Sequence, residues 1–561
     1  MGVGPRASSK EDKSLPVTLT LNGLTTDAPP GATLFDCAER LGVRVPTSCL
    51  KNGKCKECVV EVTDGVEWLT PPTSAERHLT APFRLSCQAA ATGGTGVVRC
   101  HTMRRGQMRI ERHALDADAM AAGRRLDPAV TRDGDRILLQ GEEIARSTAP
   151  IHGLAMDLGT TTVVLRLFNL ETGDQIADAS FENPQRFGGS DVMSRIQYDT
   201  VHPGKLLRRT VAGYLTHVIQ EFPVDPATIY EMVVVGNSTM RDLFFRQNVY
   251  SIGQTPYQSI TEIEMARGER TSTVLVETGR RCLLPIHPKA RVYGAPIISG
   301  HVGADAAACM LAVDMMHEDR LVAVMDIGTN TELVVGNRHR MLAASCPAGP
   351  AFEGGAIACG MPALEGAVED VSIDDNGSIA LGVIGGGVPQ GICGSGLIDA
   401  LSELVRTGRM NHMGRFEDGA DRIVLDAEHD VHLSERDVNE LAQAKGANVA
   451  GLRTVISQYG ARFEDIDVFY LAGGFGRHIK VEAAKRIGLI PDLPDGRVVR
   501  IGNAAIEGAT TALLSISKRR ELEDAVRRVE HCRLETHPDF FDSFVFGCQF
   551  TPVVVEPEVA G

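Results

Sequence analysis

Four cysteines near the N-terminus constrain the fold of this chain more than any other feature. Three of them fall within one loop and the fourth stands alone further along: Cys49, Cys55, Cys58 and Cys87. The spacing is therefore C-x5-C-x2-C followed by a distant cysteine. Thiolates gathered in this way bind soft metal ions or iron–sulfur clusters. The chain around them must close tightly over such a centre.

The elements around these cysteines resemble a ferredoxin of the β-grasp type. Residues 17–21 alternate as a strand, Asn22-Gly23 is a hairpin turn signal, and residues 33–41 have the apolar face of a short helix. Plant-type ferredoxins use C-x4-C-x2-C with a distant fourth cysteine. The first gap here is one residue longer, as in ferredoxins of the adrenodoxin type. We therefore predict that this segment binds a [2Fe–2S] cluster.

A structural zinc site is the alternative for the same four cysteines. C-x2-C is a common zinc half-site, and four thiolates suit tetrahedral zinc. Zinc sites usually pair two such half-sites, whereas here three cysteines share one loop. Lys51, Lys54 and Lys56 also place positive charge beside the thiolates, which lowers a thiol pKa and favours a reduced cluster. The pattern favours [2Fe–2S] over zinc.

A second feature is a motif that occurs twice in the rest of the chain. Residues 153–167 and 321–335 each read as an apolar strand that ends in Asp, a D-[LI]-G-T-[TN]-T turn and a second strand. We interpret this as a duplicated domain whose halves face each other. Glycines in such turns let backbone N–H groups approach phosphate oxygens. The predicted phosphate-binding residues are Gly159, Thr160, Thr161, Gly328, Thr329 and Asn330.

The aspartates that end the two strands, Asp157 and Asp326, are placed to hold hydrated Mg²⁺, which takes few carboxylates and keeps its waters. Two ordinary hairpin turns are the simpler alternative, and the repetition argues against it. Neither a G-x-x-x-x-G-K-[ST] loop nor a strand–G-x-G-x-x-G–helix fingerprint occurs in the sequence. We therefore predict a triphosphate with Mg²⁺ as the ligand, and we take the two aspartates as candidate catalytic residues.

Further glycine-rich segments complete the predicted nucleotide site. Gly394, Ser395 and Gly396 begin a helix whose N-terminus suits an anion. A strand runs into Gly473-Gly474-Phe475, where a flat adenine could lie against the backbone. The small-residue helices at 303–312 and 503–512 suit a tight crossing between the halves, although ordinary helix packing explains them equally well.

The order of these segments is similar to that of the actin-like superfamily, which includes sugar kinases and heat-shock chaperones. With a ferredoxin in front, nearly the whole chain resembles the reductive activators of corrinoid-dependent enzymes. The resemblance implies an α+β and α/β multidomain protein with a β-grasp [2Fe–2S] ferredoxin domain, a short linker and a duplicated actin-like, ribonuclease-H-like ATPase domain. The short connector argues against the separate middle domain expected of larger members.

The predicted layout runs from a disordered tail to a C-terminal helix and strand. Its parts are a tail at 1–15, the ferredoxin domain at 16–100, a flexible linker module at 101–150 with short strands at 108–110 and 137–139, an ATPase domain at 151–561 with halves at about 151–318 and 319–500, and the terminal elements at 501–561.

The resemblance also implies a function and partners. Members of the family use ATP to return one electron to the Co(II) corrinoid of a partner methyltransferase protein, which restores Co(I). The corrinoid must belong to that partner, because this chain has no D-x-H-x-x-G motif. An electron-donor reductase would feed the cluster, and a homodimer is one candidate assembly.

Composition excludes several other classes. A net charge of −15 argues against nucleic-acid binding. No apolar stretch reaches about 18 residues, and the N-terminus lacks a signal peptide, so we expect a cytoplasmic protein without a membrane span. The remaining cysteines are scattered and read as buried thiols.

Three other functions remain open. A redox-regulated small-molecule kinase would need a base near the γ-phosphate, for which Glu332 and Glu353 are candidates. An activator of radical dehydratases or reductases would carry a [4Fe–4S] cluster shared between subunits. An Hsp70-like binding module would need a peptide-binding domain, which the sequence does not reveal.

Overall fold

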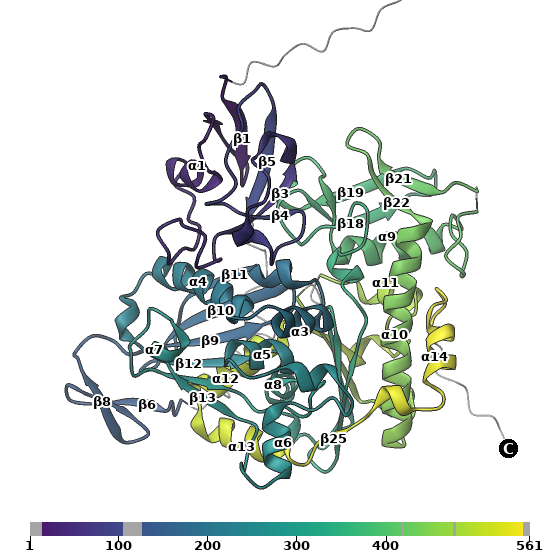
Figure 1. Cartoon of the computed structure of the whole chain (residues 1–561). Helices are drawn as coiled ribbons and strands as arrows, with labels where there is room; N and C mark the ends of the chain where they lie inside the picture. The colour runs from purple at the N-terminus through teal and green to yellow at the C-terminus, as the bar shows by residue number, and fades with distance from the viewer. Residues whose placement is uncertain (1–13, 105–125, 418, 475–477, 554–561) are drawn as a thin grey trace, which may run out of the picture.

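The computed structural model describes residues 14–104, 126–417, 419–474 and 478–553. Figure 1 shows the N-terminal ferredoxin domain resting against a larger body. Its sheet has the order β2-β1-β5-β3-β4. The elements are β1 (Val17–Leu21), β2 (Leu24–Ala28), α1 (Leu34–Arg40), β3 (Val59–Asp64), β4 (Phe83–Leu85) and β5 (Val97–Thr102). Within the described ranges, no helix combines the length and the apolar character that a membrane span requires.

Local sequence explains the start of this domain. Asn22 and Gly23 both have positive φ, at 50° and 81°, as a two-residue hairpin between β1 and β2 requires. Thr33 and Asp36 form a capping box at the start of α1. The predicted strand, turn and helix are all confirmed. The predicted strand at 108–110 lies outside the described residues.

The predicted linker contains a small antiparallel sheet of β6 (Val130–Asp133), β7 (Arg136–Leu139) and β8 (Glu142–Arg146). The chain just before it is fixed to the body, because Asp127 donates its backbone N–H to Leu514 and accepts a hydrogen bond from the Ser515 hydroxyl. The flexibility predicted for this segment remains a prediction.

The body contains two similar six-stranded sheets, with the orders β11-β10-β9-β12-β14-β13 and β24-β23-β15-β16-β17-β25. In each, an antiparallel meander continues into two parallel strands. The first sheet consists of β9 (His152–Leu158), β10 (Thr162–Asn169), β11 (Gln175–Glu182), β12 (Ile229–Val235), β13 (Leu275–Thr278) and β14 (Arg291–Gly294). The second consists of β15 (Val322–Ile327), β16 (Thr331–Gly336), β17 (Met341–Cys346), β23 (Val468–Ala472), β24 (Val498–Gly502) and β25 (Glu530–His531). The shared topology confirms the duplicated fold inferred from the two motifs.

Helices surround these two sheets, and two small sheets lie beside α9 (Gly394–Arg406) (Figure 1). The helices of the first half are α3 (Val192–Val201), α4 (Leu206–Glu221), α5 (Ser238–Phe244), α6 (Ile260–Ala266), α7 (Gly279–Cys282) and α8 (Ala304–Ala312). Those that follow are α9 (Gly394–Arg406), α10 (Glu435–Tyr459), α11 (Val481–Arg486), α12 (Ala504–Leu514), α13 (Ile516–Val526) and α14 (Phe540–Gly547). Two small sheets join β18 (Ala367–Ile373), β19 (Ile379–Val383) and β20 (Gly391–Ile392), and β21 (Arg422–Asp426) and β22 (Val431–Ser434).

The helices α8 and α12 cross between the halves, as the small residues in both segments suggested. A Cβ on Gly508 in α12 would lie 2.0 Å from the backbone oxygen of Ala308 in α8. Their backbones therefore approach so closely that only glycine fits at the crossing.

Replacing Gly508 by alanine should consequently destabilise the body. Alanine favours an isolated helix by about 1 kcal/mol, so a net loss must come from the clash, and we expect about 1–3 kcal/mol. Urea unfolding followed by circular dichroism measures this, with Gly496→Ala as the matched control, because a Cβ there meets nothing within 4 Å. Equal stability of the two variants would contradict the tight crossing.

The ferredoxin domain docks on α4 of the first half (Figure 1). One continuous apolar core includes Leu19 and Val59 of the ferredoxin domain and Leu154 and Tyr214 of the body. Polar contacts surround it: the Met103 N–H donates to the Tyr214 hydroxyl at 3.0 Å, and Arg209 pairs with Glu57 at 2.7 Å, Arg104 with Glu221 at 2.8 Å and Arg186 with Glu61. Because Glu57 lies between Cys55 and Cys58, the cysteine loop faces the body.

Candidate functional site

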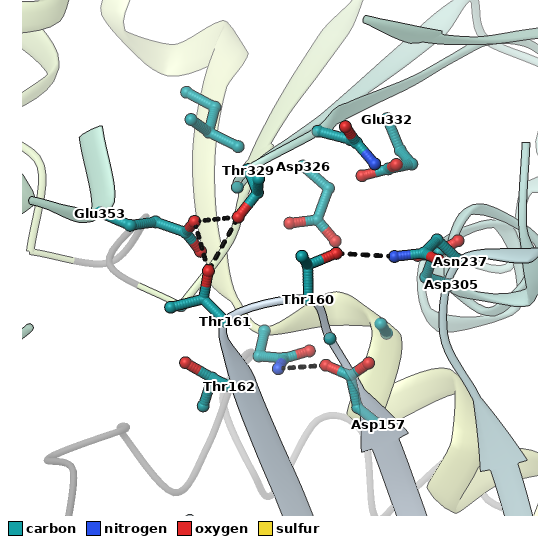
Figure 2. A pocket seen from close by; sticks show the side chains of 17 residues that line it. Asp157, Thr160, Thr161, Thr162, Asn237, Asp305, Asp326, Thr329, Glu332 and Glu353 are labelled. Carbon is teal, nitrogen blue, oxygen red and sulfur yellow. Dashed lines mark hydrogen bonds between the residues drawn. The ribbon is translucent and has the colours of Figure 1, made fainter. Parts of the chain in front are cut away.

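The two repeated motifs meet at a cavity of about 100 Å³ between the halves of the body. Figure 2 shows the turn after β9 and the turn after β15 facing each other across it. The predicted residues that line it are Asp157, Gly159, Thr160, Thr161, Asp326, Gly328, Thr329, Asn330 and Gly474. The structure thus brings both predicted phosphate loops and both predicted magnesium ligands to one place.

The first phosphate loop is held by backbone and amide hydrogen bonds. The Gly159 N–H donates to the Thr162 carbonyl at 2.9 Å, and a Cβ on Gly159 would lie 2.7 Å from that oxygen. Asn183 donates to the Gly159 carbonyl at 2.7 Å, and Asn237 donates to the Thr160 hydroxyl at 2.9 Å. Hydrogen bonds from within the loop and from two asparagines outside it thus hold this loop in place.

A glutamate joins the two loops. The Thr161 and Thr329 hydroxyl oxygens are 2.8 Å apart, and both hydroxyls donate to Oε2 of Glu353, the Thr161 bond measuring 2.8 Å. Glu353 ends the short helix Ala351–Glu353, which follows β17. Figure 2 shows the three side chains as a triangle at the tips of the loops.

Five carboxylates line the cavity, and none of its described lining residues is Lys or Arg. Burial raises the pKa of Asp157 to about 7, of Asp326 to about 6 and of Asp305 to about 7. Burial also raises the pKa of Glu332 and of Glu353. Carboxylates drawn together away from water favour a bound cation, which fits the predicted Mg²⁺.

Sequence reasoning missed several side chains that complete the cavity. Asn503, the N-cap of α12, donates to Asp157 at 2.8 Å. Asp305 lies in the first turn of α8. Glu332, named from the sequence only as a candidate base of a kinase, accepts a hydrogen bond from Ser345 at 3.2 Å. Asn503 and Asp305 stand at the starts of the two connecting helices, which was the signal available in the sequence.

The predicted adenosine and anion segments are only partly placed at the cavity. Gly473 directly follows β23 and has a φ of 124°, and a Cβ there would lie 2.4 Å from the Ile327 oxygen, so the chain packs closely behind the second predicted phosphate loop. Phe475 lies outside the described residues. Gly394, Ser395 and Gly396 form the first turn of α9 and are not among the residues lining the cavity. The role of these three residues remains a prediction.

The four predicted metal-binding cysteines form two pairs. The thiols of Cys49 and Cys55 are in hydrogen-bond contact, and so are those of Cys58 and Cys87. The hydrogen bond from Cys58 lowers the pKa of Cys87 to about 6. No three His, Cys, Asp or Glu side chains in the described part of the chain converge as ligands of a single metal ion.

This pairing fits a two-iron cluster better than one zinc ion, because each iron of a [2Fe–2S] cluster takes two protein ligands. Backbone N–H groups of Asn52, Lys54 and Cys55 face the Cys49 sulfur and lower its pKa, against the effect of burial. Such donors stabilise charged sulfur. One of the three expected lysines is engaged elsewhere, since Lys51 pairs with Asp36 at 2.9 Å and Glu39 at 2.6 Å.

Family models match nearly the whole chain. A model described as a 2Fe-2S iron-sulfur cluster binding domain matches residues 17–92, one described as the RACo middle region matches 152–318, and one described as the C-terminal domain of RACo, the ASKHA domain, matches 320–557. The first confirms the predicted [2Fe–2S] domain. The second matches the first half of the body, which the sequence analysis had placed at about 151–318.

Named relatives agree with these matches. The corrinoid activation enzyme RamQ of Eubacterium limosum is 33% identical over 431 residues, which are 72% of this chain and 70% of the relative. A [Co(II) methylated amine-specific corrinoid protein] reductase of Methanosarcina barkeri is 24% identical over 417 residues, 70% of this chain and 75% of the relative. A solved structure titled reductive activator for corrinoid, iron-sulfur protein has a TM-score of 0.70 at 26% identity and covers 97% of this chain and 100% of its own.

The family models cover both the domain with the four cysteines and the cavity between the halves of the body. Two of these models are named for the same protein, and the solved structure covers 97% of this chain, including both parts. This chain belongs to the family of reductive activators of corrinoid-dependent proteins, with a [2Fe–2S] ferredoxin domain fused to an actin-like body.

Proposed function

We propose that this protein uses ATP to pass one electron to the Co(II) corrinoid of a partner methyltransferase protein, which restores Co(I). The observation that carries the proposal is the docking of the cysteine loop on the half of the body that supplies one phosphate loop, through Arg209 and Glu57. The proposed electron-carrying domain is therefore in direct contact with the half of the body that contributes to the proposed nucleotide cavity.

In this proposal, ATP supplies the free energy for an electron transfer that is uphill. One electron moved ~100 mV uphill costs about 2.3 kcal/mol, since 59 mV corresponds to a tenfold change for a one-electron couple. A domain movement driven by a difference in affinity of a few kcal/mol between two states can supply this. The cavity lies between the halves, so a ligand that draws its two loops together would move one half relative to the other.

Each part of the chain has a proposed role. Cys49, Cys55, Cys58 and Cys87 would hold the cluster, which supplies one-electron chemistry when bound. Asp157 and Asp326 would hold Mg²⁺, and the two loops would bind the phosphates of ATP. Gly473, Gly474 and Phe475 would lie against the adenosine, and Gly394, Ser395 and Gly396 would complete the anion site.

The proposed partners are a corrinoid-binding methyltransferase protein and a reductase that reduces the ferredoxin domain. The test mixes the protein under anaerobic conditions with a reductant, a Co(II) corrinoid protein and Mg-ATP, and follows the Co(I) absorbance. We expect Co(I) to form only when ATP is present. Its failure to form, or its formation at the same rate without ATP, would overturn the proposal.

Nucleotide binding should depend strictly on a divalent cation. Five carboxylates in one cavity repel a triphosphate unless a cation lies between them. We expect ATP without Mg²⁺ to leave the thermal midpoint unchanged, whereas Mg-ATP at 100 times its Kd should stabilise the protein by about 2.7 kcal/mol. Differential scanning fluorimetry with and without EDTA measures this, and equal stabilisation by metal-free ATP would contradict the assignment.

One observation favours a small-molecule kinase as a second candidate. A cavity of about 360 Å³ adjoins the nucleotide cavity and shares Asn237 and Asn330 with it. Thr239 is one of the residues that line it, and the buried hydroxyl of Thr239 has no hydrogen-bond partner among the described residues. Transfer of phosphate from ATP to a neutral polyol, without any corrinoid protein, would favour this candidate over the activator.

A further inference from the structure

The contacts of Glu353 set it apart from the other four carboxylates of the nucleotide cavity. Asp157 and Asp326 lie near the ends of strands of the two repeated motifs, Asp305 lies in the first turn of α8, and Glu332 lies on β16. Glu353 comes from a short helix outside both motifs and reaches the tips of the loops (Figure 2). If both loops bind phosphate, as proposed, the terminal phosphate of the nucleotide would lie at these tips.

ATP binding would change the hydrogen bonds of the Glu353 carboxylate. An ionised carboxylate only accepts hydrogen bonds, and each threonine hydroxyl has a single proton to donate. The Thr161 and Thr329 protons are given to Glu353 in this structure. Once phosphate oxygens take those two protons, Glu353 loses both donors and faces a second anion.

A water molecule between Glu353 and the terminal phosphate would relieve this repulsion. It can donate one proton to Glu353 and direct its oxygen toward the terminal phosphorus. We infer that Glu353 is the general base of ATP hydrolysis, a role that rests on the proposed ATPase activity. The water oxygen bonds to the terminal phosphorus, the bond from that phosphorus to the bridging oxygen of ADP breaks, and the water proton passes to Glu353 and then to solvent.

The surroundings of Glu353 suit this role. Burial raises its pKa, while the hydrogen bonds from Thr329 and Thr161 and the nearby Arg195 guanidinium oppose the rise. A carboxylate made more basic by burial, yet kept from permanent protonation, accepts a proton effectively near neutral pH. Arg195 lies in α3, with Nη1 3.1 Å from the Met240 sulfur and Nε 3.0 Å from the Gly189 carbonyl.

Glu353→Gln tests the inference, because glutamine keeps the shape and the acceptor oxygen but cannot take a proton. We expect single-turnover ATP hydrolysis to slow by about 100-fold or more, while the thermal shift given by Mg-ATP persists. Glu428→Gln is the matched control, since it makes the same change at an exposed glutamate that does not line the cavity. A wild-type rate in Glu353→Gln, or an equal loss in Glu428→Gln, would overturn the inference.

Chemical rescue distinguishes a role of Glu353 as general base from a role that only holds the two loops together. Formate should restore hydrolysis in Glu353→Ala by roughly tenfold, and absence of rescue in the folded variant would count against a base. Should these variants fail to fold, Glu353→Asp keeps the carboxylate but withdraws it, and a full rate in that variant would overturn the inference. Hydrolysis is measured apart from Co(II) reduction, so wild-type protein that hydrolyses ATP without forming Co(I) refutes only the proposed activator function.

Discussion

Replacing Cys58 by serine should remove the visible absorbance of the iron–sulfur cluster and nearly all electron delivery to Co(II). Cys58 is fully buried at the start of β3 and is in contact with Cys87. Serine fits the same space, but its hydroxyl is a poor ligand for iron compared with thiolate. Loss of indirect support around a metal already costs about 10–100-fold, so loss of a direct ligand should cost at least as much.

The matched control for that variant is Cys100→Ser. Cys100 is also fully buried in the ferredoxin domain, on β5, but it is not one of the four proposed ligands. The control should keep its cluster spectrum, and both variants should keep the stabilisation given by Mg-ATP. A Cys58→Ser protein with a normal cluster would remove this residue from the ligand set.

The second large effect is expected from Asp157→Asn. Asparagine preserves the shape of the side chain and removes the charge that would hold Mg²⁺. Asp157 also accepts a hydrogen bond from Asn503, which ties the metal position to the connecting helix α12. We expect ATP-dependent Co(I) formation to fall by about 100-fold or more, with the cluster spectrum unchanged.

Asp174→Asn serves as the control, because Asp174 lies in the turn between β10 and β11, away from the cavity-lining residues. Stopped-flow absorbance under anaerobic conditions gives both rates. If Asp157→Asn reduces Co(II) at the wild-type rate in the presence of ATP, Asp157 has no part in the mechanism.

Local patterns were sufficient to predict much of the fold. The Asn22-Gly23 hairpin and the helix capped at Thr33 depend on neighbouring residues, and the duplicated sheets follow from a motif that occurs twice. The runs of small residues left two interpretations of α8 and α12 open, a tight crossing or ordinary packing, and the close approach at Gly508 decides for the crossing.

The missed parts of the candidate site depend on tertiary contacts. Asn503, which the sequence did not assign to the site, is 346 positions from Asp157. Glu353, named from the sequence only as a candidate base of a kinase, is 192 positions from Thr161, so its contact with both loops could not be predicted. The docking of the ferredoxin domain through Arg209 and Glu57, which are 152 positions apart, could not be predicted from the sequence either. Such contacts depend on the tertiary fold and leave no local pattern in the sequence.

The most direct test of the central claim is a single-turnover experiment with prereduced protein. The reduced protein is mixed anaerobically with a Co(II) corrinoid protein, and cluster oxidation and Co(I) formation are followed together by their absorbance. With Mg-ATP, we expect both signals to change at the same rate and in equal amounts, and without Mg-ATP we expect neither to change. Co(I) formation without ATP, or without matching oxidation of the cluster, would contradict ATP-dependent electron transfer from the cluster to Co(II).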